Sequence, residues 1–135
     1  MYLVTVKVKK SSIDGKGVFA KEDISKGTVV WKYTEGHDKK MSVEEFGELS
    51  DTSKKLLQRI AYLSETSGKW VIPPQNDPAC FTNHDQNPNT TVVFDPQISE
   101  EPIFIANRTI QKDEEITNSY LEFDMNTQQK SHSWL

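Results

Sequence analysis

The sequence predicts a domain that is mainly β with short helices, and three observations carry this prediction. The chain opens with a run in which apolar and polar residues alternate. Several later runs are short, rich in β-branched or aromatic residues, and separated by glycine, proline or asparagine. Only two stretches have helical spacing. With 135 residues, the chain has the usual size of one domain with a modest core.

The first predicted strand runs from Tyr2 to Lys9, because its apolar and polar residues alternate as in a half-buried strand. A turn follows, in which Gly15 and Gly17 lie two residues apart and lead into the apolar run 18–20. Glycine permits positive φ and the close approach of a ligand. Such a pair alone is equally typical of a tight turn between strands.

Residues 24–33 combine a Lys-Gly turn with a β-branched and aromatic strand, in which Trp31 and Tyr33 would share a face. A first helix is expected at Ser42, because Glu45 follows it at capping-box spacing. A second helix is expected from about residue 52 to residue 63, with its apolar residues in the core. These residues are Leu56, Leu57, Ile60, Ala61 and Leu63.

The later strands are expected at residues 70–72, 91–94 and 103–106, with a last short one ending at Tyr120. Between them lies the turn-rich segment 81–89, which contains Asn83, His84 and Pro88. Its amide and imidazole groups converge on a loop that Pro88 stiffens, as in a binding site. A hydrophilic surface turn is the alternative interpretation.

Composition narrows the function classes. The net charge of −4 argues against a general nucleic-acid or acidic-membrane binder, so no direct nucleic-acid binding is expected and a basic protein tail is an acceptable partner. Cys80 is the only cysteine, which excludes an internal disulfide framework and a cysteine-cluster zinc site. The amino-terminal run lacks the apolar stretch of a signal peptide, and no run is long enough for a membrane span. A cytoplasmic protein, or a nuclear one in a eukaryote, is expected.

Four signals occur in a fixed order: residues 15–20 (Gly-Lys-Gly-Val-Phe-Ala), Tyr33, Asn83-His84 with Pro88-Asn89, and residues 114–120 (Glu-Glu-Ile-Thr-Asn-Ser-Tyr). Together they resemble the SET-domain protein lysine methyltransferases, over nearly the whole chain. The resemblance implies a single SET domain over residues 1–135, with a core of residues 1–120 and a tail of residues 121–135. It also implies a β-clip-like fold of several small sheets, with a knot-like threading of the carboxyl-terminal segment.

The resemblance implies a binding site for S-adenosylmethionine and no metal. Lys16 and Gly17 would meet the methionine end through their backbone, and Phe19 belongs to the same cofactor-binding segment. Asn83 would bond the amino-acid part, and His84 would hold the adenine largely through its main chain. Close amides at one end and a shaped edge at the other suit a charged cofactor that carries an aromatic base. A structural histidine that ties the loop together is the alternative role of His84.

The family's active-site tyrosine matches Tyr120, and Tyr33 matches a second channel tyrosine more loosely. Methyl transfer from a sulfonium needs a neutral amine aligned with the methyl group and sulfur, which a tyrosine hydroxyl can help to orient. Asn118 occupies a channel position where many relatives carry Phe or Tyr, so the number of methyl groups added is not inherited. Phe123 or Trp134 in the tail would complete the lysine channel, since the flanking zinc segments of many relatives are absent. A tail whose aromatic residues pack on the domain or on a second subunit is the alternative.

The sequence departs from the family at other positions too: Cys80, Thr82 and Asp85 replace the commoner residues around Asn83-His84, and Asp113 replaces a glycine. The expected activity is transfer of a methyl group from S-adenosylmethionine to a lysine of a protein or peptide. A homodimer is left open. The alternatives are a non-catalytic SET-like module that binds a peptide and, more remotely, a β-clip-type binding domain.

Overall fold

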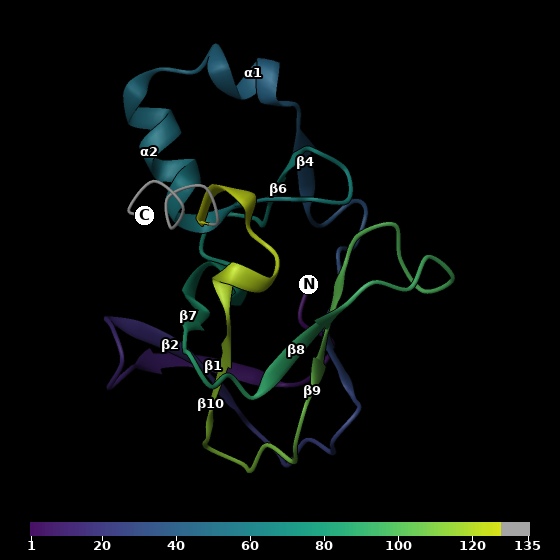
Figure 1. The fold of residues 1–135 in the computed structure, drawn as a ribbon. Coiled ribbons are helices and arrows are strands. Elements are labelled where there is room, and N and C mark those ends of the chain that lie inside the picture. The colour runs from purple at the N-terminus through teal and green to yellow at the C-terminus, as the bar shows by residue number, and fades with distance from the viewer. Residues whose placement is uncertain (128–135) are drawn as a thin grey trace.

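The computed structural model describes residues 1–127, in which ten short strands, two α-helices and two 3-10 helices follow one another (Figure 1). The strands are β1 (Val6–Lys10), β2 (Lys16–Ala20), β3 (Val29–Trp31), β4 (Lys39–Met41), β5 (Tyr62–Leu63), β6 (Trp70–Ile72), β7 (Asn83–His84), β8 (Thr90–Val93), β9 (Ile103–Ala106) and β10 (Glu115–Asn118). The helices are α1 (Val43–Gly47), α2 (Asp51–Ile60), η1 (Pro78–Phe81) and η2 (Tyr120–Glu122). The mainly β prediction is confirmed.

Three small sheets build the fold, with strand orders β1-β2-β10-β7, β3-β9-β8 and β4-β6-β5. The last strand, β10, pairs antiparallel with β2 and parallel with β7. Figure 1 shows this yellow strand between the purple β2 and the teal β7. The pairing brings together the glycine turn, the Asn83-His84 pair and the start of the carboxyl-terminal segment. The knot-like threading of that segment stays a prediction.

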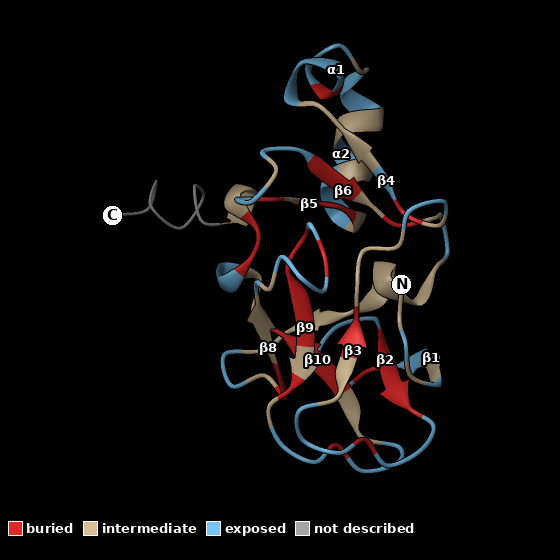
Figure 2. Cartoon of the chain, turned by 90° about the vertical axis from the view of Figure 1, so that its right-hand side faces the viewer, coloured by how far each residue is buried: buried red, intermediate tan, exposed pale blue. Residues whose placement is uncertain are grey.

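The main core draws on all three sheets. Most of its buried residues belong to β2, β3, β9 and β10, and it also contains Tyr62 of β5, Val71 of β6 and Phe123. A second, smaller cluster consists of Phe46, Ala61 and Trp70, with partly buried neighbours from the helices and β4–β6. Figure 2 shows the difference, because buried strands gather in the lower part of the molecule while α1 and α2 are largely exposed.

The predicted first strand is divided into two pieces in the structure. Tyr2 makes an isolated bridge with Trp31, and Leu3 N donates to Val30 O at 2.8 Å, whereas β1 itself starts only at Val6 and pairs with β2. The amino-terminal segment therefore joins two sheets. Alternation along the sequence indicates extended backbone but cannot say which partner each part of it has.

The prediction for the second helix was wrong in its end and in its burial. α2 ends at Ile60, and the next residues turn into β5. No residue of α2 is buried, and Leu56 is 49% exposed. Ala61, which follows the helix, is buried in the second cluster. Helical spacing reports which residues share a face, whereas burial depends on what the rest of the chain packs against that face. Here Leu56 and Ile60 line cavities.

The last strand also ends earlier than predicted, because β10 stops at Asn118 and Tyr120 begins η2. Several other boundaries agree with the sequence. β6 and β9 have the predicted limits, and β8 begins one residue earlier than expected. Ser42 caps α1, because its Oγ accepts from Glu45 N at 3.1 Å. The Glu45 carboxylate accepts from the Ser42 hydroxyl instead of reaching the Ser42 amide. β4 and η1 were not predicted.

Candidate active site

A cavity of about 690 Å³ opens where the glycine turn, α2, η1 and the carboxyl-terminal segment meet. Five of the residues singled out from the sequence line it: Lys16, Asn83, Asn118, Tyr120 and Phe123. The structure therefore brings together groups from four separate parts of the chain. Gly17, Phe19, His84 and Tyr33 do not line the cavity. Trp134 lies outside the described residues.

Asn83 joins the glycine turn to β10. Its Nδ2 donates to Glu115 Oε2 at 2.8 Å, to Lys16 O at 3.1 Å and to Asp14 O at 3.2 Å. Ser11 Oγ donates to the other carboxylate oxygen of Glu115 at 2.7 Å. We call Ser11, Asn83 and Glu115, with the carbonyls of residues 14 and 16, the glycine-turn clamp. The clamp orients the Asn83 amide, and within residues 1–127 no donor bonds its Oδ1, so that oxygen is available to a ligand.

Gly17 is required by the same clamp and not by the cavity wall. A Cβ at this position would lie 2.7 Å from the carboxyl carbon of Glu115 and 3.1 Å from Ser11 Cβ. The missing side chain therefore lets Glu115 approach the backbone of β2. The group that approaches Gly17 closely in the structure is a carboxylate of the protein itself, so the predicted approach of a ligand to Gly17 stays a prediction.

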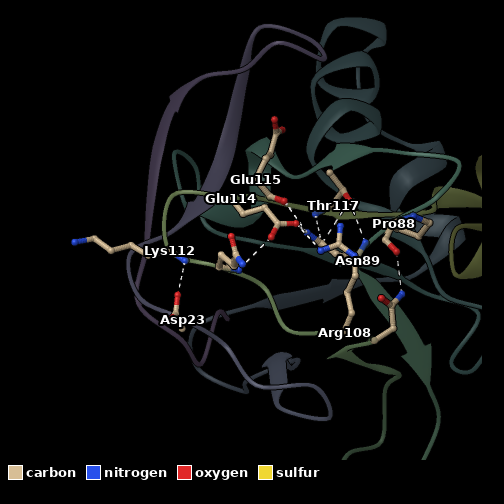
Figure 3. A network of polar contacts seen from close by, with 10 residues as sticks. Asp23, Pro88, Asn89, Arg108, Lys112, Glu114, Glu115 and Thr117 are labelled. Atoms are coloured by element: carbon tan, nitrogen blue, oxygen red, sulfur yellow. Dashed lines mark hydrogen bonds and ion pairs between the residues drawn. The ribbon is translucent and has the colours of Figure 1, made fainter.

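The Pro88-Asn89 pair belongs to a network of polar contacts that holds the loop (Figure 3), and neither residue lines the cavity. Asn89 is 2% exposed; its Oδ1 accepts from Thr117 N at 2.9 Å and its Nδ2 donates to Glu115 O at 2.7 Å. Asn107 Nδ2 donates to Pro88 O at 2.9 Å. These bonds fasten the loop that follows Asn83 to the main chain of β10. Asp85, one of the departures from the family, joins in through its amide, which donates to Asn118 O at 3.0 Å.

His84 also connects the loop to the carboxyl-terminal segment. Its Nδ1 accepts from the main-chain amide of Tyr120 at 3.1 Å, and the two ring centroids are 5.2 Å apart. The imidazole ring is therefore used in positioning Tyr120. The main chain of His84 lies in β7, beside β10.

Tyr120 presents its hydroxyl group to the cavity in a defined orientation. The hydroxyl donates to Thr82 O at 2.6 Å. Burial raises the pKa of Tyr120, with smaller contributions from Asp124 and Asp14, so the phenol stays neutral at physiological pH. Since its proton is given to Thr82 O, the oxygen has lone pairs left to accept from an N–H donor. Such a hydroxyl can orient an amine.

Tyr33 occupies a different environment. The Lys40 ammonium lies 4.7 Å from the centroid of its ring, and Lys40 also forms an ion pair of 3.0 Å with the fully buried Glu101. Desolvation raises the pKa of Tyr33, against the opposing effect of Lys40. Tyr33 packs against the main core, so the structure does not place it with Tyr120 in the cavity wall. Its role as a channel residue stays a prediction.

An aromatic wall that the sequence did not reveal lies at the inner side of the cavity. Its residues are Trp31, Tyr62 and Phe104, with Phe123. Ring centroids are 5.2 Å apart for Trp31 and Phe104 and 5.1 Å apart for Tyr62 and Phe123. Tyr62 had been assigned to the second helix, which hid its place on an extended segment. The position of Tyr62 could have been predicted only if residues 61–63 had been assigned to a strand and not to the helix.

Three buried polar atoms of residues that line the cavity have no hydrogen-bond partner within residues 1–127: Trp31 Nε1, Tyr62 Oη and Asn118 Oδ1. Burial raises the pKa of Tyr62 well above its usual range, and the carboxylates of Glu101, Asp38 and Asp124 add to this. Buried polar groups normally have partners, so these atoms are suited to a polar ligand. Aromatic faces next to them suit the stem and charged end of a lysine.

The start of the tail completes the cavity wall. Phe123 is 7% exposed, and its ring centroid lies 4.9 Å from that of Phe104 and 6.0 Å from that of Tyr120. Asp124 Oδ1 accepts from Leu63 N at 3.0 Å, which attaches the segment to β5. Phe123 thus lines the cavity as predicted for a channel residue, although it does so from within the core.

Within residues 1–127, no group of three or more His, Cys, Asp or Glu side chains is arranged to hold a metal ion. The helices of this part of the chain are also too short or too polar to cross a membrane.

Comparison with known proteins was made by sequence and by structure. A model of the SET domain matches residues 15–121 of the chain. A candidate histone methyltransferase of Plasmodium falciparum is 26% identical over 87% of this chain and 93% of its own, with a TM-score of 0.59. A humanized mutant of Chaetomium thermophilum Polycomb Repressive Complex 2, bound to the inhibitor GSK126, is 25% identical with a TM-score of 0.62; the match covers 89% of this chain but 15% of that one. An apo ctPRC2 chain in an autoinhibited state, 22% identical, has the same fold with a TM-score of 0.67, over 96% of this chain and 17% of that one. No curated protein matches the sequence.

Proposed function

The chain belongs to the SET-domain family, and on this premise we propose that it is a protein lysine N-methyltransferase that uses S-adenosylmethionine. One observation carries the proposal: the free Oδ1 of the clamped Asn83 and the oriented hydroxyl of Tyr120 belong to the wall of the same cavity. An acceptor for a ligand ammonium and an acceptor for a substrate amine would thus serve one site.

The residues of the glycine turn fit the amino-acid end of the cofactor. Asn83 Oδ1 would accept from its ammonium, and the backbone at Gly15 and Lys16 would lie beside its methionine part. When bound, S-adenosylmethionine would supply a methyl carbon activated by the positively charged sulfur, for transfer to a neutral lysine nitrogen with S-adenosylhomocysteine as the leaving group. The clamp would keep the turn in place before the cofactor arrives, so less ordering is needed on binding.

Tyr120 and the aromatic wall would prepare the substrate amine. An apolar channel lowers the pKa of an entering lysine by desolvation, which favours its neutral form. The Tyr120 oxygen would accept an N–H of that amine, and this leaves the nitrogen lone pair free for attack. Trp31 Nε1, Tyr62 Oη and Asn118 Oδ1 would give the amine or a water molecule further partners. Asn118 differs from its counterpart in many relatives, so the number of methyl groups added has to be measured.

A basic peptide is the proposed substrate class. Asp14 and Asp124 line the cavity, and the chain has a net charge of −4. Complementary charge would speed encounter with a lysine-rich tail. The two similar structures of 25% identity or more are a candidate histone methyltransferase and a Polycomb complex, which supports a histone-like tail as the first substrate to try. A cytoplasmic or nuclear location remains part of this proposal.

Incubation with labelled S-adenosylmethionine and a library of lysine peptides, followed by mass spectrometry, tests the proposal. Methylated lysine is expected from the wild-type protein, and at least about a hundredfold less from Tyr120→Phe, which is the usual scale for a group that positions a reacting atom. Isothermal titration should give equal cofactor affinity for both proteins. Wild-type protein that binds no S-adenosylmethionine would contradict the enzyme proposal.

A peptide-binding module without catalysis is the second candidate, and the position of Tyr33 favours it. Tyr33 lies outside the cavity under Lys40, so only one of the two matched tyrosines lines this site. Under this reading, fluorescence titration would show binding of lysine peptides that depends on the aromatic wall, while mass spectrometry would find no methyl transfer. Comparing the two assays on the same peptides separates the candidates.

A further inference from the structure

Two tyrosines of the cavity wall are joined through one residue. The Tyr120 hydroxyl donates to the main-chain oxygen of Thr82 at 2.6 Å. The Tyr2 hydroxyl and Thr82 Oγ1 share a second hydrogen bond, also of 2.6 Å. All three residues line the cavity. Thr82 is therefore held at its carbonyl by one tyrosine and at its side chain by the other.

Tyr2 is held in place by its backbone and by its side chain. Tyr2 pairs with Trp31 of β3, and its side chain packs against the main core. Burial raises the pKa of Tyr2, and the nearby Tyr120 adds to this, so its hydroxyl stays neutral. A neutral, buried hydroxyl needs a partner, and Thr82 Oγ1 is that partner.

Thr82 is one of the positions where the sequence departs from the family pattern. Its hydroxyl makes the bond to Tyr2, which an aliphatic side chain of the same size could not make. Thr82 also ends η1 and directly precedes Asn83, so a shift of its backbone would move both the Tyr120 acceptor and the glycine-turn clamp. The departure thus introduces a contact that couples β3 to the catalytic tyrosine.

We propose that Tyr2 is a positioning residue that acts through Thr82 to fix the hydroxyl orientation of Tyr120. With Thr82 O held in place, the Tyr120 proton points at that carbonyl and the oxygen faces the amine as an acceptor. Without the Tyr2 bond, the Thr82 carbonyl moves more freely, and the Tyr120 hydroxyl can turn its proton toward the amine lone pair. The inference rests on the proposed function, because Tyr120 acts on an amine only in that setting.

Kinetics of Tyr2→Phe and Thr82→Val form the first test. Each variant removes one hydroxyl and keeps the shape of the side chain. We expect kcat to fall about three- to tenfold, the range for one lost neutral hydrogen bond, with the KM for cofactor changed less than about twofold. The double variant should be no slower than either single variant, because both break the same bond. Thr82→Ser should restore kcat, and Thr109→Val, at an exposed threonine, should leave it unchanged.

Nuclear magnetic resonance of protein labelled with ¹³C at the tyrosine ζ carbon is the second test, and it needs no turnover. The Tyr120 signal, assigned with Tyr120→Phe, should shift in Tyr2→Phe and in Thr82→Val and stay in place in Thr82→Ser and Thr109→Val. A Tyr120 signal that does not move in Tyr2→Phe overturns the inference, as does an unchanged kcat. If the wild-type protein methylates no peptide, the proposed function fails while the Tyr120 signal still decides the coupling. Thermal unfolding of each variant identifies any that fails to fold.

Discussion

The two sides of the cavity are held in place by different kinds of interaction. On one side, the glycine turn, β7 and β10 are joined by directional bonds between side chains and main chain, such as those of Asn83 and Asn89. On the other side, α2 contributes several residues to the wall, but none of them is buried. Hydrogen bonds define atomic positions, whereas apolar contacts between partly exposed residues allow adjustment. The bonded side suits an invariant cofactor, and the helical side suits peptides of varied sequence.

The largest expected effect is a difference in unfolding free energy between substitutions in the main core and in the smaller cluster. Phe104 stacks on Trp31 and contacts Phe123 in the main core, whereas Phe46 stacks on Trp70 at 4.5 Å in the small cluster. We expect Phe104→Ala to lower the free energy of unfolding by about 3 to 5 kcal/mol. Phe46→Ala should cost at least about 1 kcal/mol less, because the short α1 can relax into the space.

Urea unfolding followed by circular dichroism measures both changes. Leu56→Ala, at a residue that is 49% exposed on α2, serves as the control and should change the free energy of unfolding by less than about 1 kcal/mol. Equal losses of unfolding free energy in the two phenylalanine variants would contradict the expected difference between the main core and the smaller cluster.

The next largest effect is expected on the side of the cavity that is formed by the glycine turn, β7 and β10. Asn89→Ala removes the partners of Thr117 N and Glu115 O inside the protein. Buried groups left without partners cost about 1 to 3 kcal/mol each, so we expect a loss of about 2 to 4 kcal/mol. Asn87→Ala, at an exposed neighbour in the same loop, should lie within about 0.5 kcal/mol of the wild-type value. A loss at Asn89 below about 1 kcal/mol, measured by thermal unfolding, would mean that water replaces the side chain.

The sequence allowed prediction of one side of the cavity better than of the other. Asn83 and Tyr120 could be identified because the motifs around them resemble those of the SET-domain family, and both line the same cavity. Ser11 and Glu115, which complete the clamp, are 104 positions apart, so no local pattern connects them. Tyr62 was hidden because the periodicity of α2 continues into residues that form β5.

The limits of the strands were also easier to predict than the surroundings of α2. β6 and β9 were predicted at their observed limits, since turn residues enclose short β-branched runs. The burial of α2 was not predictable, because it depends on tertiary contacts, and Leu56 and Ile60 of this helix line cavities. Pattern reports which residues share a face, and tertiary contacts decide what covers that face.

Removal of the amino-terminal cap of α2 should have a smaller effect on the unfolding free energy than the substitution of Asn89. Ser50 Oγ accepts from Ser53 N at 3.2 Å and starts α2. Ser50→Ala should lower the free energy of unfolding by about 1 kcal/mol, the usual cost of a lost cap. Ser50→Asp keeps an acceptor at the cap and should be nearly neutral. If the two variants were equally destabilised in urea, the hydroxyl itself and not the cap would matter.

The smallest expected effect is the dependence of stability on pH at the edge of the bonded side. Burial alone would raise the pKa of the Glu114 carboxyl, but hydrogen bonds from Arg108, Gln111 N and Asn89 hold that pKa below its usual value. A carboxyl with a lowered folded-state pKa stabilises the protein above its unfolded-state pKa, about 4.5, and this stabilisation is lost as the pH falls through the lower folded-state value. Its size should stay below about 1 kcal/mol, because the Arg108 pair is partly exposed.

Glu114→Gln removes this titration and should therefore flatten the decrease of unfolding free energy between pH 7 and the region below about pH 4.5. The matched control is Glu122→Gln, since Glu122 is exposed and its carboxylate makes no hydrogen bond or ion pair within residues 1–127. Urea titrations of the three proteins at each pH should show wild type and Glu122→Gln in parallel, with Glu114→Gln converging on them in acid. Parallel curves for all three would mean that Arg108 and Asn89 do not favour the ionised form, and that the neutral amide satisfies the same partners equally well.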